Sequence, residues 1–98
     1  MTPLAMALAG GHLEASKLLI EKGANVNAIV DGGGNLLFFI ASSGKKDLVE
    51  LLLKNGAKVN HKNKYGETPL DEAADEKIAD LLRKHGGKTG EELEAEGK

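Results

Sequence analysis

Short apolar segments with helical spacing follow one another along the chain. In residues 46–54, Leu48, Val49, Leu51 and Leu52 stand at positions i, i+1, i+3 and i+4, which is the pattern of an amphipathic helix. Glycines stand where such segments end: Gly11, Gly23, Gly44, Gly56 and Gly86. Because glycine adopts a left-handed conformation at little cost, these positions predict helix ends.

The whole pattern repeats with a period of 33 residues. The segment GANVN at residues 23–27 returns as GAKVN at residues 56–60, and the same offset relates Leu4 to Leu37 and to Leu70. The last unit is shorter, because three residues are missing between Ala74 and Ile78. A fixed period of this length is typical of a solenoid built from stacked units.

Each unit predicts two helices followed by a polar loop. Thr2 and Thr68, each followed by proline, predict the starts of first helices, since threonine caps free N–H groups and proline fits the first turn. Asn35 keeps a capping residue in the middle unit, and the polar stretch 60–67 predicts a hairpin-like connection. One core is predicted, formed by Leu4, Leu18, Leu19, Leu37, Ile40, Leu48, Val49, Leu51, Leu52, Leu70, Ala73, Ile78, Leu81 and Leu82.

These motifs resemble the ankyrin repeat. The likeness runs from GHLE at residues 11–14 through GANVNA at residues 23–28, and YGETPL at residues 65–70 matches the family's loop and first-helix start. The resemblance implies an all-α ankyrin-repeat solenoid of three stacked helix pairs linked by β-hairpin-like loops. The closing stretch 78–87 is similar to the final repeat of many small bacterial ankyrin proteins.

The resemblance also implies a division of the chain. An ankyrin-repeat domain is expected over residues 1–88, with repeats at about 1–29, 30–62 and 63–88. The motif begins at Thr2, so the first repeat is expected to be truncated at its N-terminus or the chain to be a fragment. The chain departs from the family at Val30, where an aspartate is usual, and at Phe38, where a histidine is usual.

The acidic segment 89–98 lies beyond the repeats. Thr89 and Glu92 form a capping-box pattern, which predicts a short frayed helix. Four glutamates and a single large apolar residue, Leu93, equally favour disorder beyond about that residue.

The composition of the chain argues against two classes of protein, nucleic-acid binders and membrane-spanning proteins. The chain has 13 basic and 15 acidic residues and a formal net charge of −2, which argues against a dedicated nucleic-acid binder. No apolar run approaches the ~20 residues of a membrane span, and the chain has no cysteine. A cytoplasmic location is expected. Lysines concentrate in residues 45–64 and acids in residues 67–80, which indicates either two solvated faces or a dipolar surface that orients a partner.

The sequence carries no complete motif for chemistry. Gly87, Lys88 and Thr89 form half of a phosphate-binding loop, but Leu82 stands where the first glycine of that loop is required. The three histidines fall at different positions of three units, and no histidine–acid pair adjoins the serines. No catalytic, cofactor-binding or metal-binding residues are expected.

The resemblance implies a non-catalytic module that binds a protein partner through its concave loop and first-helix face. Carried over position by position, the contact residues are Ile29, Asp31, Gly32, Gly34, Ser42, Ser43, Lys62, Lys64, Tyr65 and Glu67. Tyr65 is the expected anchor, with Phe38 and Phe39 as a rival patch of which at least one belongs to the core. The alternative is a regulatory fragment of a longer multidomain protein. Weak self-association is also expected through the uncapped N-terminal face around Met1, Leu4, Leu8 and Ala15.

Overall fold

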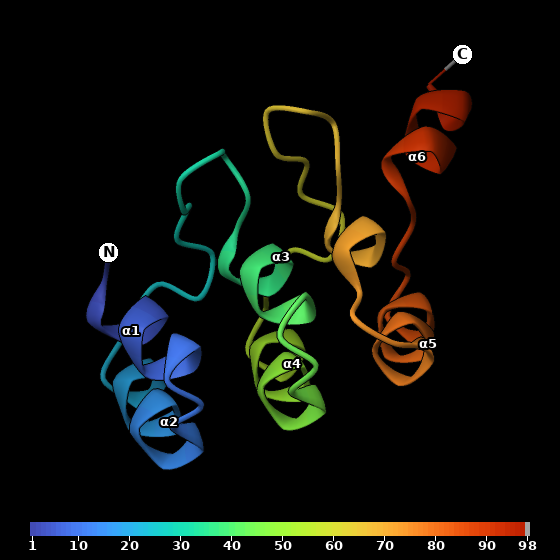
Figure 1. Cartoon of the computed structure of the whole chain (residues 1–98). Helices are drawn as coiled ribbons and strands as arrows, with labels where there is room; N and C mark the ends of the chain where they lie inside the picture. The colour runs from blue at the N-terminus through green and yellow to red at the C-terminus, as the bar shows by residue number, and fades with distance from the viewer. Residues whose placement is uncertain (98) are drawn as a thin grey trace.

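A computed structural model describes residues 1–97 of the chain. Its elements are α1 (Pro3–Ala9), α2 (Leu13–Glu21), α3 (Leu36–Ala41), α4 (Lys46–Lys54), the 3₁₀ helix η1 (Pro69–Glu72), α5 (Glu76–Lys84) and α6 (Gly90–Glu96). Successive pairs stack side by side into an elongated body with extents of 41 × 25 × 18 Å (Figure 1).

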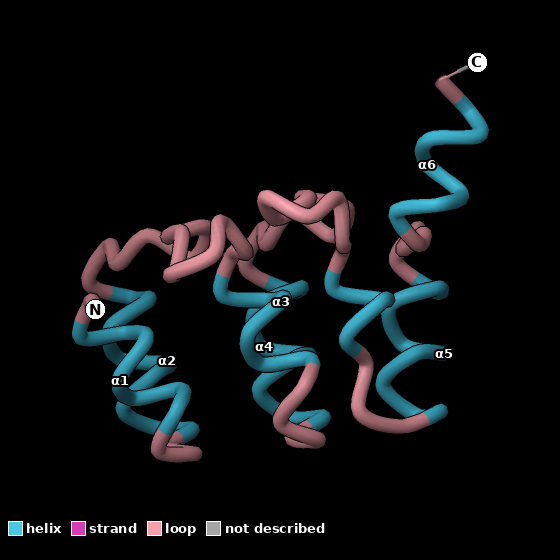
Figure 2. The backbone as a smooth tube through the Cα atoms, turned by 45° about the horizontal axis from the view of Figure 1, so that its top comes forward, coloured by secondary structure: helices cyan, strands magenta, loops and turns pink. Residues whose placement is uncertain are grey.

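The three predicted helix pairs are α1 with α2, α3 with α4, and η1 with α5. The connections between pairs all project to the same side, and the second helices form a row away from them (Figures 1 and 2). Within the described residues, strand pairing is limited to a single antiparallel bridge, Ile29 with Asn35, at the base of the first connection. The structure therefore confirms an all-α solenoid with hairpin-like loops.

The helix boundaries follow the local signals in the sequence. The Thr2 hydroxyl accepts the Ala5 N–H at 3.1 Å, and the Asn35 side chain accepts the Phe38 N–H at 2.9 Å. The five glycines predicted to end helices all have positive φ angles. In the third pair, the three missing residues fall between the two helices. The first helix of this pair, η1, is a single short 3₁₀ helix.

The core runs through all three pairs. Most of the predicted positions are buried or pack half-buried against the buried cluster, which also includes Ala5, Leu8, Leu36 and Ala41. Leu18 was expected in this core and is instead 54% exposed. Its repeat equivalent Leu51 lies on α4, which packs against helices on both sides, whereas α2 packs against α4 alone among the second helices.

Two half-buried asparagines, Asn27 and Asn60, form side-chain hydrogen bonds that join one repeat to the next. The Asn27 side chain accepts the Lys58 N–H at 2.8 Å and donates to the Gly56 carbonyl at 3.1 Å. Thirty-three residues later, Asn60 accepts the Lys88 N–H at 2.8 Å and donates to the Gly86 carbonyl at 3.0 Å. The same residue type therefore makes the same bridge at each junction.

Residues 90–96 of the acidic C-terminal segment form the helix α6, so the structure shows the short helix that the capping-box pattern predicted. Its N-terminus has the predicted capping box between Thr89 and Glu92. The start of α6 is also anchored to the body, because the Gly90 N–H donates to Asp71 Oδ2 at 2.8 Å. These tertiary contacts, which no local pattern shows, explain why the helix extends to Glu96.

Candidate partner-binding face

The two inter-repeat connections are tied together at their tips. We call residues 29–35 the first loop and residues 61–67 the second loop. The Lys64 N–H donates to the Gly32 carbonyl at 3.0 Å, and the His61 ring Nε2–H donates to the Gly33 carbonyl at 2.8 Å. A side chain at Gly33 would place its Cβ 3.1 Å from the Lys64 nitrogen, so the close approach favours glycine there. The two loops consequently form one continuous surface.

Asn63 shapes the second loop from within. Its Oδ1 accepts the backbone N–H groups of Tyr65 and Glu67, each at 2.9 Å, and its Nδ2 donates to the Glu67 carboxylate at 2.9 Å. Sequence reasoning missed this residue as part of the site. The signal was present, because Asn63 stands 33 residues after Val30, where the family usually has a polar aspartate.

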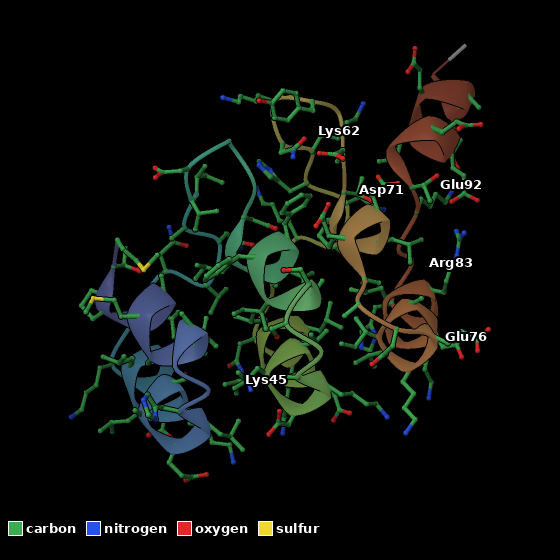
Figure 3. All side chains as sticks on the ribbon, viewed as in Figure 1. Lys45, Lys62, Asp71, Glu76, Arg83 and Glu92 are labelled. Atoms are coloured by element: carbon green, nitrogen blue, oxygen red, sulfur yellow. The ribbon has the colours of Figure 1, made fainter. Side chains whose placement is uncertain are left out.

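Tyr65 is presented at the tip of this supported loop. The residue is 73% exposed, and the Lys64 ammonium lies 5.3 Å from the centre of its ring. Lys62 is exposed on the same loop and projects near its tip (Figure 3). An aromatic ring beside two cations offers both apolar contact area and positive charge.

A groove of about 470 Å³ opens beside the first loop. Its walls are the aliphatic and aromatic side chains of Ile29, Leu36 and Phe39, and its rim includes Thr2 and Asp31. Ile29 is 56% exposed here. Phe39 packs against the core and also lines the groove, which confirms that at least one of the two phenylalanines belongs to the core.

Not all of the predicted contact residues are available to a partner. Gly34 is buried, and an added Cβ would lie 2.8 Å from the Phe38 ring, so Gly34 supports the loop and offers no contact surface. Glu67 is half-buried and engaged by Asn63. Ser42 and Ser43 are exposed, but they lie at the far end of α3, where their hydroxyls donate to the Phe39 and Ile40 carbonyls.

Charge alternates beside the second loop. The second loop carries the cations Lys62 and Lys64, and the acidic helix α6 stands beside that loop (Figure 1). One of its carboxylates is strongly paired: Arg83 donates to Glu92 Oε1 at 2.6 Å. That bond, together with the Thr89 backbone N–H, lowers the pKa of Glu92 to about 2.

No grouping of three or more histidine, cysteine, aspartate or glutamate side chains suited to a metal ion occurs within residues 1–97. None of the helices in that part of the chain is both long and apolar enough to cross a membrane. The arrangement at the loops is an exposed, hydrogen-bonded surface.

A family model described as ankyrin repeats, in three copies, matches residues 1–63 and 28–92. The chain belongs to the ankyrin-repeat family. Ankyrin repeats are generally protein-interaction modules and are generally non-enzymatic, which agrees with the surface described above. The family assignment also explains the 33-residue period and the row of loops.

Several curated relatives contain sequences similar to this ankyrin-repeat chain. Ankyrin repeat and KH domain-containing protein mask of Drosophila melanogaster is 43% identical over 72 residues, covering 71% of this chain and 2% of that protein. The mouse B-cell lymphoma 3 protein homolog is 35% identical, covering 84% of this chain and 18% of that protein. Serine/threonine-protein kinase 12 of Arabidopsis thaliana is 37% identical, covering 74% and 16% respectively. The chain thus spans a small part of the length of these relatives.

Proposed function

We propose that this ankyrin-repeat chain is a non-catalytic recognition module that binds a protein partner through its loop tips and the adjoining groove. The proposed contact residues are Ile29, Asp31, Gly32, Lys62, Lys64 and Tyr65, with Ser42 and Ser43 at the far edge. The observation that carries the proposal is the exposed Tyr65, held on a loop that Asn63 shapes from inside.

Physical chemistry favours Tyr65 as the anchor. Tyrosine contributes a large contact area with only two rotatable side-chain bonds, so little conformational entropy is lost when it is buried by a partner. The loop beneath it is already fixed by the bond from the Lys64 N–H to the Gly32 carbonyl. A partner that covers Tyr65 therefore does not have to order the loop first.

Opposite charges flank this anchor. Lys62 and Lys64 favour acidic groups on the partner, while Asp31 at the rim of the groove favours a basic group. The apolar lining between Ile29 and Phe39 accommodates an aliphatic or aromatic side chain. These features define a directional surface that positions a partner across both loops.

A binding experiment with the double variant Tyr65→Ala and Lys62→Glu tests the proposal. Wild-type protein is used to capture partners, which are identified by mass spectrometry and then purified for direct titration. We expect the double variant to bind at least about tenfold more weakly, since an interface anchor contributes about 2 kcal/mol or more. The control is Lys17→Glu on α2, which reverses one exposed charge away from the loops. Equal affinity of the double variant, with its helical circular dichroism intact, would sink the assignment of this face.

The alternative proposal is that the chain acts as a regulatory segment within a longer protein. The small share of each relative that the chain covers favours it. The natural reading frame upstream of Thr2 discriminates the two proposals, because further domains encoded there would make the chain a segment. We place either activity in the cytoplasm, which imaging of the tagged natural protein tests.

A further inference from the structure

The surface between α4 and α5 is hollowed into a groove on the side of the molecule away from the loop tips. α4 contributes one stripe of side chains spaced four residues apart: Lys46, Glu50 and Lys54. α5 contributes the facing stripe: Lys77, Asp80, Leu81, Lys84 and His85. Two adjoining hollows share Lys46, Leu81 and Lys84, so they form one continuous depression.

Four lysines mark the two ends of this groove. α4 and α5 are the second helices of successive repeats and pack against each other in the same direction. Lys46 and Lys77 therefore stand at the end where the helices begin, and Lys54 and Lys84 at the end where they finish. The middle of the groove holds the half-buried Leu81 and the carboxylates of Glu50 and Asp80.

The helix dipole favours a lysine at only two of these four positions. Lys54 and Lys84 occupy the last turns of their helices, where the helix dipole favours positive charge. Lys46 and Lys77 occupy first turns, where the same dipole disfavours it. The helix dipole therefore does not account for the cations at that end, where Lys46 forms an exposed ion pair with Glu50 and Lys77 is exposed.

The equivalent stripe of the first repeat does not have this charge pattern. Thirty-three residues before the α4 stripe, the positions are occupied by Leu13, Lys17 and Glu21 on α2. The terminal lysines are replaced there by an apolar residue and an acid. The cationic ends of the α4 stripe are therefore not shared by the corresponding stripe of α2.

We propose that this groove is a second docking site, which receives an acidic amphipathic helix from another protein. Lys46 and Lys54 are eight residues apart, or about 12 Å along the helix axis, so they match two carboxylates about two turns apart on a helix lying in the groove. An apolar side chain midway between them rests on Leu81. Glu50 disfavours an acid at that middle position, and its exposed ion pair with Lys46, at 3.7 Å, is free to exchange for the ligand carboxylate.

A peptide of stated sequence pattern tests the proposal directly. The probe is an N-acetylated, alanine-based helical peptide of about 20 residues, long enough to form a helix in water. It carries two glutamates eight positions apart with a leucine midway, and the control peptide carries glutamines in place of the glutamates. Amide chemical shifts of the ¹⁵N-labelled protein are followed during titration. Saturable shifts confined to α4 and α5 are expected with the glutamate peptide and not with the glutamine peptide.

Matched variants separate the groove from general electrostatics. Lys46→Glu with Lys54→Glu reverses both paired cations and is expected to weaken binding at least about tenfold, while Lys17→Glu with Lys22→Glu on α2 makes the same change of net charge and stays within about twofold. Lys46→Glu places an acid in a first turn, which the helix dipole favours, whereas Lys54→Glu places one in a last turn, which the dipole disfavours, so helical circular dichroism is compared for both double variants. A peptide with lysines in place of the glutamates is expected to bind the charge-reversed variant.

Three results would overturn this site: shifts that do not saturate at millimolar peptide, shifts that map to the loop tips, or equal affinity for the two peptides. Tighter binding of a short DNA duplex or of anionic phospholipid vesicles through the same lysines would also overturn the choice of a protein helix. The variant Tyr65→Ala with Lys62→Glu should bind the peptide as the wild type does. The docking groove and the loop-tip face can therefore fail independently.

Discussion

Asp71 Oδ2 accepts the backbone N–H of Gly90 at 2.8 Å and thereby joins the first turn of the third repeat to the first residue of α6. The same oxygen accepts the Thr68 N–H at 2.9 Å. Thr68 is the N-cap of η1, as the sequence predicted, and forms a capping box with Asp71, while its hydroxyl also donates to the Lys88 carbonyl at 2.6 Å. The start of α6 is consequently fastened to the third repeat by a small, partly buried hydrogen-bond network.

Removal of the Asp71 carboxylate should release α6. In Asp71→Ala the N–H groups of Thr68 and Gly90 lose their shared acceptor, and a hydrogen bond to a charged group contributes about 1.5–3 kcal/mol. We expect faster amide hydrogen exchange over α6 and a free energy of unfolding lower by about 1–2 kcal/mol. Asp80→Ala, an exposed acid on α5, is the control. Unchanged exchange in α6 would contradict the anchoring role.

Gly90 is required for a close approach of the backbone. A Cβ at this residue would lie 1.9 Å from the Gly66 carbonyl oxygen, a distance at which the two segments must separate. Gly90→Ala should therefore shift the start of α6 away from the second loop, with large amide shift changes at both segments. Gly97→Ala at the other end of the helix has its nearest contact at 3.5 Å and is expected to leave both segments in place. Similar spectra for the two variants would count against this contact.

The ion pair between Glu92 and Arg83 should make the stability of α6 depend on pH. The pKa of Glu92 is lowered from 4.5 to about 2, first by the Arg83 side chain and then by the Thr89 backbone N–H. Because the folded-state pKa is the lower one, the stabilisation is complete above about pH 4.5 and is lost as the pH falls toward 2. A carboxyl-detected titration should give a midpoint near 2 for Glu92. Arg83→Gln should raise that midpoint, and an unchanged midpoint would exclude Arg83 as the main cause.

The repeat pattern predicted the helices better than it predicted their surroundings. The capping residues placed the helix starts at Thr2 and Asn35, because capping is determined by residues close in sequence. Leu18 was misassigned because its periodicity is identical to that of Leu51, while its exposure depends on which neighbours pack against α2. Sequence spacing shows which face is apolar but not what covers it.

The same limit applies to the candidate site. The loop positions of Tyr65 and Lys62 could be read from the motif, and the structure leaves both exposed. The burial of Gly34 under Phe38 and the role of His61 could not, since both arise from side chains that meet only after the loops fold. The anchor of α6 could not be read from local patterns for the same reason, because Asp71 lies 19 residues earlier in the chain.

The repeated asparagines should stabilise the junctions between repeats. In Asn60→Ala the Lys88 N–H and the Gly86 carbonyl both lose a partner, and in Asn27→Ala the same happens at Lys58 and Gly56. We expect each variant to lose about 1–2 kcal/mol in urea-induced unfolding. Asn55→Ala is the control, because its side chain bonds only within the end of its own helix, to the Leu51 carbonyl. A loss at Asn55 equal to that at Asn60 would contradict a specific junction role.

The exposed apolar face of the first repeat should cause weak self-association and low stability. Leu4 and Leu8, which the sequence placed on this face, are instead buried in the core. The exposed apolar residues are Met6 and Leu18, at 60% and 54%, whereas their repeat equivalents, Phe39 and Leu51, are half-buried. A domain of so few repeats is expected near the lower end of the ~5–15 kcal/mol range of folding stability.

Sedimentation equilibrium should show reversible association of the wild type at high concentration, and Met6→Lys with Leu18→Lys should abolish it. The matched control Lys17→Glu with Lys22→Glu alters exposed charge on α2 and retains the apolar face, so it should still associate. A strictly monomeric wild type with a melting temperature above ~80 °C would show that this face neither attracts a second copy nor lowers stability.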